Sequence, residues 1–209
     1  MAPAALIVAA LVPLMALTPA LWNGYALLQY DTGGYLARWY EGYLVPSRST
    51  VYGLYLHLGE STHFWGTLVA QALAVLWLTQ GVLRAFGLGR PGQVVVIMAV
   101  LCATTALPVL TSLLLTDIFA GLAVLALYLL VAHRARFGAI ETAALVAFIA
   151  FATASHSATC GVLAGLCGAG FAVRPWLRKR LALSGLALGT LALALGAVLL
   201  LAANFALSG

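Results

Sequence analysis

Long apolar runs dominate the chain, and short polar or basic connections separate them. Seven of these runs are predicted to be transmembrane helices, at residues 4–22, 63–83, 94–110, 116–132, 139–154, 159–173 and 181–205. A helix needs about 20 apolar residues to cross the hydrocarbon layer. The runs at 139–154 and 159–173 are shorter, so we expect a tilted or partly buried hairpin there. The pattern therefore predicts an all-α membrane protein, with one helical domain over residues 1–209.

One long segment, residues 23–62, is too polar to be a span. It holds three of the five acidic residues and most of the tyrosines. Within it, the apolar and aromatic side chains of residues 35–44 recur with a helical period, while Arg38 and Glu41 face the other way. An aromatic-rich amphipathic helix lies flat in the membrane interface. We expect residues 35–44 to form such a helix in the first outer loop.

The composition supports this class of protein. The chain is 64% hydrophobic and 7% charged, whereas a soluble domain has about 25% charged residues. The net charge of +5 is therefore interpreted as a topology signal and not as a sign of nucleic-acid binding. The three cysteines lie in apolar runs, which favours small buried side chains over a disulfide or a zinc site.

The basic residues predict the orientation. Eight of the ten lie in three connections, residues 84–93, 133–138 and 174–180. Seven spans place all three connections on one face, which the positive-inside rule makes cytoplasmic. The amino terminus is then cytoplasmic, and the loop of residues 23–62 is periplasmic or extracellular, in a bacterial inner (plasma) membrane. The first run has no basic segment before it, which favours a membrane anchor over a cleaved signal peptide.

Four polar residues are predicted to lie near the outer face: Asp31, Arg48, Asp117 and His156. Ionisable groups that share one membrane face form a hypothesis for a functional site, and we expect these four to meet there. Gly33 and Gly34 are expected to make a tight turn beside Asp31. Asp31 and Asp117 each precede a predicted helix, so a helix cap is the alternative role for both.

Arg48 lies between two serines, and a guanidinium in such a place suits a phosphate or pyrophosphate group. A solvated arginine at the lipid surface is the alternative. His156 is suited to binding a phosphate, to moving protons or to capping a turn. A divalent metal ion held by Asp31, Asp117 and His156 is a further alternative, although no spacing motif supports it.

This layout resembles the polytopic glycosyltransferases of the GT-C fold. The resemblance lies in the inward amino terminus, the long outer loop with Asp31 soon after the first span, the interfacial helix, and Asp117 at the outer start of the fourth span. Seven spans match the amino-terminal module of that family. The resemblance implies that a sugar, hexosyl or pentosyl, moves from a polyprenyl-phosphate donor to an acceptor in the cell envelope.

The resemblance also implies roles for residues. Asp31 corresponds to the catalytic base of an inverting displacement, and Asp117 to the second acidic position. Arg48 and His156 would stabilise the departing lipid phosphate, and Tyr35 and Arg38 are the other expected substrate-binding residues. The chain departs from the family in having a lone Asp31 where many members have an acidic pair. It also stops directly after a span, so we expect a truncated protein or a fragment.

Other classes of function stay open. A transporter or lipid flippase places ionisable groups and broken helices near the bilayer midplane, and the span interiors here are almost free of charge. A non-catalytic membrane scaffold is the third interpretation, against which stands the concentration of Tyr, Arg and Asp in one outer loop. Gly161-x-x-x-Gly165 and Gly185-x-x-x-Gly189 are predicted to let helices approach closely.

Overall fold

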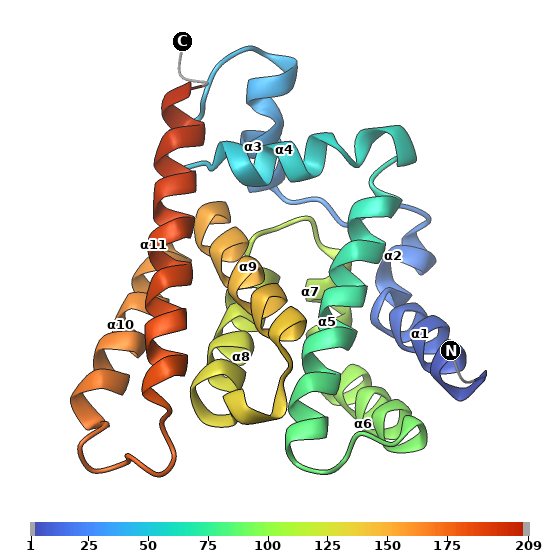
Figure 1. The fold of residues 1–209 in the computed structure, drawn as a ribbon. Coiled ribbons are helices and arrows are strands. Elements are labelled where there is room, and N and C mark those ends of the chain that lie inside the picture. Colours follow the sequence, from blue (N-terminus) through green and yellow to red (C-terminus); the bar gives the residue numbers. More distant parts are fainter. Residues whose placement is uncertain (1–2, 207–209) are drawn as a thin grey trace. The chain divides into compact units, whose positions relative to one another are not determined.

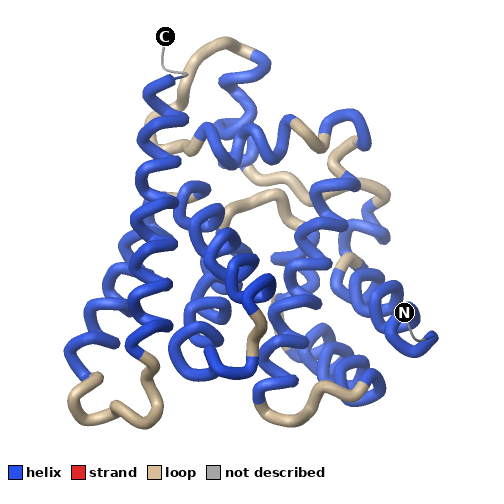
Figure 2. The backbone as a smooth tube through the Cα atoms, viewed as in Figure 1, coloured by secondary structure: helices blue, strands red, loops and turns tan. Residues whose placement is uncertain are grey.

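The structure is a computed structural model that describes residues 3–206. Helices make up most of this part of the chain, which has no strand and one isolated β-bridge, between Leu27 and Leu113 (Figures 1 and 2). The all-α class is therefore confirmed. The helices are α1 Pro3–Ala16, α2 Thr18–Asn23, α3 Tyr30–Tyr40, α4 Thr50–His57, α5 Trp65–Ala85, α6 Pro91–Thr104, α7 Leu107–Ser112, α8 Asp117–His133, α9 Ala139–Ser155, α10 Ser157–Val173 and α11 Leu183–Ala206, with the 3-10 helices η1 Glu60–Thr62 and η2 Arg134–Arg136.

Among the described residues, three helical segments are long and apolar enough to cross a membrane: Trp65–Ala85, Asp117–Arg136 and Leu183–Ala206. Shorter apolar helices occur at α1, α6, α9 and α10. These segments support a membrane location and contact with a lipid bilayer. The count of seven spans stays a prediction.

Two of the predicted spans are interrupted by prolines. The run at residues 4–22 is divided at Leu17 into α1 and α2, and Pro19 lies in the first turn of α2. The run at residues 94–110 is divided between Thr104 and Leu107, and Pro108 lies in the first turn of α7. Proline cannot donate the backbone hydrogen bond of a helix interior but fits a first turn. Each of these two runs therefore consists of two successive helices, and whether each run crosses the membrane stays a prediction.

The interfacial helix differs in its bounds from the prediction. Helix α3 begins at Tyr30 and ends at Tyr40, so residues 41–44 lie outside it. Gly42 adopts a left-handed backbone, with φ of 77°, and the Arg38 guanidinium donates a hydrogen bond to its carbonyl at 2.8 Å. A left-handed glycine is a common helix terminator. That this helix lies in the membrane interface stays a prediction.

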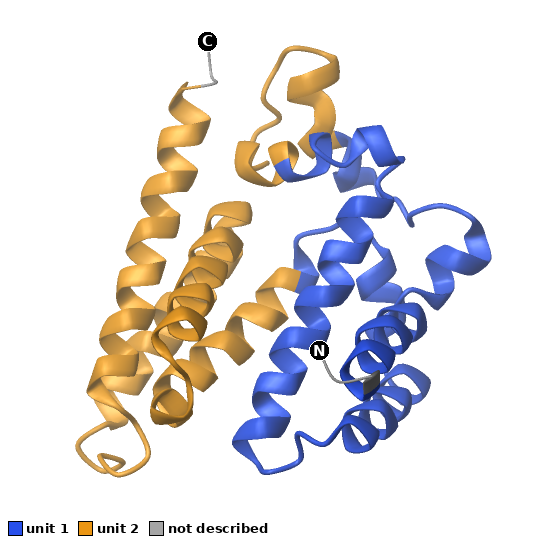
Figure 3. Cartoon of the chain, turned by 45° about the vertical axis from the view of Figure 1, so that its right-hand side comes forward, with its two compact units in different colours: residues 1–33, 55–118 blue, residues 34–54, 119–209 orange. Residues whose placement is uncertain are grey.

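The packing divides the described chain into two compact units (Figure 3). Unit 1 takes the residues up to Gly33 together with Tyr55–Ile118, and unit 2 takes Gly34–Leu54 and the residues from Phe119 onward. The single domain over residues 1–209 stays a prediction.

In unit 1, α1 packs against α5, α6 and α7. Val12, Ala16, Leu68 and Met98 are buried in this core. The turn after α4 is closed locally, since the Tyr55 hydroxyl donates a hydrogen bond to the Thr67 carbonyl at 2.7 Å. Burial raises the pKa of the Tyr55 hydroxyl, so it keeps its proton and stays a donor at neutral pH.

In unit 2, α11 packs along α9 and α10. A Cβ at Gly185 would collide with the Leu130 carbonyl oxygen of α8, so the close approach predicted for the Gly185-x-x-x-Gly189 pattern is confirmed. At Gly161 and Gly165 a Cβ would meet nothing within 4 Å. Helix α10 instead buries its other face, through Leu163 and Cys167, so the close approach predicted for Gly161-x-x-x-Gly165 is wrong within this chain.

Candidate functional site

The predicted site residues are shared between the two units. Asp31 and Asp117 belong to unit 1. The expected substrate-binding residues belong to unit 2, namely Tyr35, Arg38, Arg48 and His156. The expectation that Asp31, Arg48, Asp117 and His156 meet at one site stays a prediction.

In unit 1, the segment that leads to Asp31 pairs with the segment that leads to Asp117. The Leu27 amide donates to the Ser112 carbonyl at 2.9 Å, and the Leu114 amide donates to the Leu27 carbonyl at 3.0 Å. These two bonds form the isolated parallel bridge between Leu27 and Leu113. Segments far apart in the sequence are thus fixed side by side just before each carboxylate.

Thr32 adds a second connection between these segments. Its hydroxyl donates to the Leu114 carbonyl at 2.9 Å and accepts from the Gln29 amide at 3.1 Å. The Thr32 side chain is buried, with 2% of its surface exposed. Asp31 is therefore adjacent to a residue anchored on the segment that ends at Asp117.

The two carboxylates lie at the starts of helices. Asp31 is in the first turn of α3, and Asp117 is the first residue of α8. The positive end of the helix dipole attracts a carboxylate at such a position. A role in stabilising the helix therefore stays the alternative for each acid. Asp117 is exposed and Asp31 is partly exposed, so both are also accessible to a ligand.

Gln71, which the sequence reasoning missed, supports the Asp117 segment from α5. Its side chain is fully buried, and its amide nitrogen donates to the Thr111 carbonyl at 2.9 Å and to the Leu113 carbonyl at 3.0 Å. The sequence feature that could have indicated Gln71 is its place as a polar residue within an apolar span, since such residues commonly form hydrogen bonds to neighbouring segments. Residues 111–114 are thus held by Gln71 and by the Leu27 pairing.

Replacing Thr32 with Val is expected to loosen this arrangement without changing the size of the side chain. The change removes the hydroxyl that bonds to the Leu114 carbonyl and the Gln29 amide, so both groups lose a hydrogen-bond partner. The free energy of unfolding is expected to fall by about 1–3 kcal/mol. Unfolding of the purified protein by denaturant would measure the loss. Thr32→Ser keeps the hydroxyl and is the matched control. Equal stability of the Val and Ser variants would show that the connection contributes nothing.

In unit 2, Arg48 packs on α3. Its guanidinium carbon lies 5.5 Å from the centroid of the Tyr35 ring, which is within the range of a cation–π contact. A Cβ at Gly34 would lie 3.3 Å from the Arg48 side chain, so the glycine leaves room for the arginine. Neither Gly33 nor Gly34 has a positive φ, and both lie inside α3. The predicted tight turn beside Asp31 is therefore wrong.

Tyr35 is held by other aromatic rings. It is 4% exposed, and its ring meets that of Tyr52 edge to face with centroids 4.8 Å apart. Tyr52 in turn lies 6.2 Å from Phe119, which lies 5.2 Å from Phe151. Tyr35 thus has an aromatic framework behind it and Arg48 over its face. The Arg38 guanidinium instead donates to the Gly42 carbonyl, just after the end of α3.

The Arg48 segment lies beside the His156 segment. The Ser49 hydroxyl donates to the Ala154 carbonyl, and the Thr50 amide donates to the side-chain oxygen of Asn204 at 3.0 Å. His156 is partly exposed and has an extended backbone at the junction of α9 and α10. Unit 2 therefore brings together the segments that carry Tyr35, Arg48 and His156.

Sequence reasoning also missed a local pair in unit 1. The His57 Nδ1 atom lies 2.8 Å from a Glu60 carboxylate oxygen, across the turn between α4 and η1. The spacing of three residues between His57 and Glu60 is the sequence feature that could have indicated this pair. Within residues 3–206, no group of three or more His, Cys, Asp or Glu side chains is placed to hold a metal ion.

The arrangement offers two kinds of chemistry. Unit 1 holds two accessible carboxylates at the ends of joined segments, which suits proton transfer or binding of hydroxyl groups. Unit 2 holds a guanidinium supported by a tyrosine ring, which suits a phosphate. Comparison of the chain with protein-family models, with curated proteins and with solved structures gave no match.

Proposed function

We propose that this chain is a membrane glycosyltransferase, resembling the GT-C enzymes, that moves a sugar from a polyprenyl-phosphate donor to an acceptor on the outer face of the membrane. The observation that carries the proposal is the connection in unit 1 between the segments that lead to Asp31 and Asp117. Pairing through Leu27 and Thr32 gives both carboxylates a fixed framework. Positioning of this kind is what general-base catalysis requires.

In this mechanism, Asp31 is the general base. It takes the proton from the acceptor hydroxyl as that oxygen attacks the anomeric carbon of the sugar. A bond forms between the acceptor oxygen and the anomeric carbon, and the bond from that carbon to the phosphate oxygen breaks. The polyprenyl phosphate leaves with the bonding electrons. A phosphate is a good leaving group, so no general acid is needed, and Asp117 binds the hydroxyls of the sugar or acceptor.

The residues of unit 2 supply affinity for the lipid phosphate. Arg48 is the main donor, because a guanidinium can give two parallel hydrogen bonds to a phosphate. The Arg48 side chain packs against the Tyr35 ring and beside Gly34, and this packing limits its conformations. Less conformational entropy is therefore lost when Arg48 binds a ligand. His156 adds a second donor, and Arg38 contributes positive charge on α3.

A transfer assay tests this proposal. The protein is reconstituted in lipid vesicles and given radiolabelled polyprenyl-phosphate sugars, hexoses and pentoses in turn, with a lipid extract and a cell-wall polysaccharide fraction as acceptors. Incorporation of label into an acceptor supports transfer. Movement of the labelled lipid across the vesicle membrane without incorporation would instead support a flippase, and would contradict the proposal.

The proposal includes a membrane arrangement of seven spans, with the amino terminus cytoplasmic and the helix near residues 35–44 in the outer interface. Cysteines placed in a cysteine-free background test it. Glu41→Cys and Ser157→Cys are expected to react with an impermeant thiol reagent added to intact cells, and Gly92→Cys is expected to react only after lysis. All three positions are exposed in the structure, so accessibility depends on the side of the membrane. Labelling of Gly92→Cys in intact cells would contradict the orientation.

A further inference from the structure

A basic cavity lies in unit 2 at the carboxyl end of α8, away from the residues assigned above. It has a volume of about 410 Å³. Its lining includes one histidine, one lysine and four arginines, on the connections that follow α8 and α10: His133, Arg134, Arg136, Arg178, Lys179 and Arg180. Among residues 3–206, no acidic residue lines it. The cavity is therefore strongly positive and is suited to an anionic ligand.

The backbone around the cavity is fixed by hydrogen bonds. The Ala182 amide donates to the Val131 carbonyl at 2.9 Å, which joins the connection before α11 to the end of α8. On the other side, the Arg134 guanidinium donates to the Phe137 carbonyl at 3.0 Å. The charges of the two connections are thus held near one another by the fold of unit 2.

Helix stability explains only part of this charge. A cation near the carboxyl end of a helix interacts favourably with the helix dipole, which accounts for Arg134 directly after α8. Arg178, Lys179 and Arg180 instead lie shortly before Leu183, where α11 begins. Positive charge near the amino end of a helix is unfavourable. The dipole of α11 therefore does not account for the three exposed cations on that connection.

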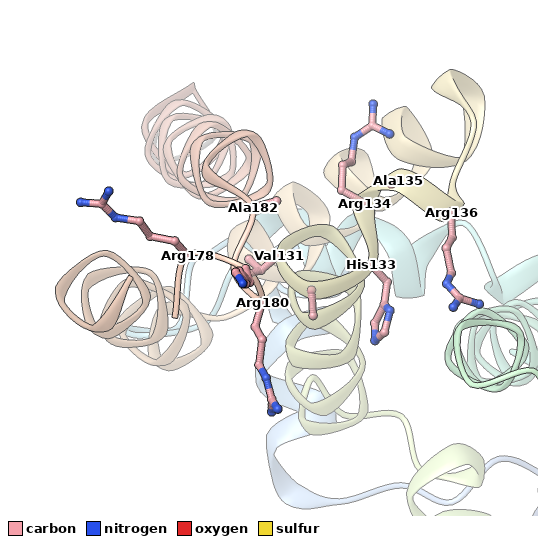
Figure 4. A pocket seen from close by; sticks show the side chains of 10 residues that line it. Val131, His133, Arg134, Ala135, Arg136, Arg178, Arg180 and Ala182 are labelled. Atoms are coloured by element: carbon pink, nitrogen blue, oxygen red, sulfur yellow. The ribbon is translucent and has the colours of Figure 1, made fainter. Parts of the chain in front are cut away.

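The direction of the side chains indicates the kind of anion. Figure 4 shows Arg178 and Arg180 on one side of the end of α8 and Arg134 and Arg136 on the other, with their guanidinium groups spread in different directions. A single small anion would bind best to donors that converge on one point. Donors that spread apart suit several phosphate groups along a surface.

The apolar neighbours indicate where those phosphates are. On the same connection as Arg178, the Trp176 side chain is 80% exposed and the Leu177 side chain is 42% exposed. Tryptophan beside basic residues is typical of a segment at the level of lipid headgroups. Basic pockets between helices on the cytoplasmic side of membrane proteins bind the headgroups of anionic lipids.

We propose that this cavity binds the phosphate headgroups of anionic phospholipids, in the leaflet that the basic connections face. Arg178 and Arg180 bind the phosphates, and Trp176 enters the interface beside them. The site is separate from the proposed sugar transfer and does not depend on it.

Calorimetric titration of the detergent-solubilised full chain with short-chain phosphatidylglycerol tests the proposal. Each basic residue that contacts a lipid headgroup contributes about a fivefold change in affinity, so loss of two cavity-lining arginines in Arg178→Gln with Arg180→Gln is expected to weaken binding about 30-fold. Arg84→Gln with Arg90→Gln removes the same charge from a connection of unit 1 and is the matched control, with an expected change within about twofold. Arg178→Lys with Arg180→Lys keeps the charge, and should keep most of the affinity.

Two results would overturn the proposal. Equal weakening in the two glutamine pairs would show a general effect of net charge. Inorganic phosphate that binds as tightly as phosphatidylglycerol, and with the same dependence on Arg178 and Arg180, would show a site for a soluble anion. Circular dichroism of each variant confirms that the helices are intact, and the lysine pair separates loss of charge from loss of fold.

Discussion

Asp31→Asn is expected to lower the rate of sugar transfer by roughly 10²–10⁴ while the donor still binds, since that is the usual contribution of a general base. Asparagine has nearly the same size as aspartate but cannot accept the proton of the acceptor hydroxyl. Initial rates at saturating donor, together with a separate measurement of donor affinity, would show this division. Asp117→Asn is expected to reduce turnover as well, and Arg48→Ala mainly to weaken donor binding.

The helix-capping alternative predicts a different result for the same variant. Asparagine lacks the charge that favours aspartate in the first turn of a helix, at a cost of about 0.3–1 kcal/mol, so a purely structural Asp31 would lose a little stability on this change while the folded protein kept its transfer rate. Glu41→Gln is the matched control, because Glu41 is an exposed acidic residue just after the end of α3. Normal transfer by a well-folded Asp31→Asn protein would refute the catalytic role of this residue.

Gly185→Leu is expected to destabilise unit 2 by more than about 3 kcal/mol, because the new side chain would overlap atoms that cannot move aside. A Cβ at this position meets the Leu130 carbonyl and lies 2.8 Å from the Val131 Cα atom. These are backbone atoms of α8, so α8 and α11 would have to separate. The expected loss is a large part of the roughly 5–15 kcal/mol that stabilises a typical fold. The yield of folded protein and its resistance to denaturant would measure it.

Gly165→Leu provides the comparison. Gly165 also lies in an apolar helix and belongs to a small-residue pattern, but a Cβ there meets nothing within 4 Å. The substitution is expected to change stability by less than about 1 kcal/mol, since surface substitutions usually have small effects. Equal losses in the two variants would mean that helix propensity, and not the contact with α8, determines the effect at Gly185.

The positions of the helices were largely predictable from the sequence, because hydrophobic runs of sufficient length form helices in a membrane protein. The bounds of α8, α9 and α10 lie within a few residues of the predicted ones. Two of the predicted spans are divided into two helices near a proline. Pro19 and Pro108 each lie in the first turn of a short second helix. A hydrophobic run alone does not show where the first helix ends and the second begins.

Contacts between distant segments were not predictable from one sequence. The spacing at Gly161 and Gly165 is the same as at Gly185 and Gly189, yet only the second pair faces a neighbouring helix. A spacing describes one face of a helix but not what lies opposite. The roles of Thr32 and Gln71 likewise depend on the carbonyl groups of residues 111–114, which became their partners only in the folded structure.

The connections of the polar segment also set an order of assembly. Thr32 bonds to a residue 82 positions later, Ser49 to one 105 positions later, and Thr50 to one 154 positions later. A chain is synthesised from its amino terminus, so Thr50 cannot reach its partner until Asn204 has been made. Residues 27–50 therefore leave the ribosome early but cannot complete their contacts until most of α11 has been made. Until then this segment is open to proteases and chaperones, and a ribosome that stalls before Asn204 would leave it exposed.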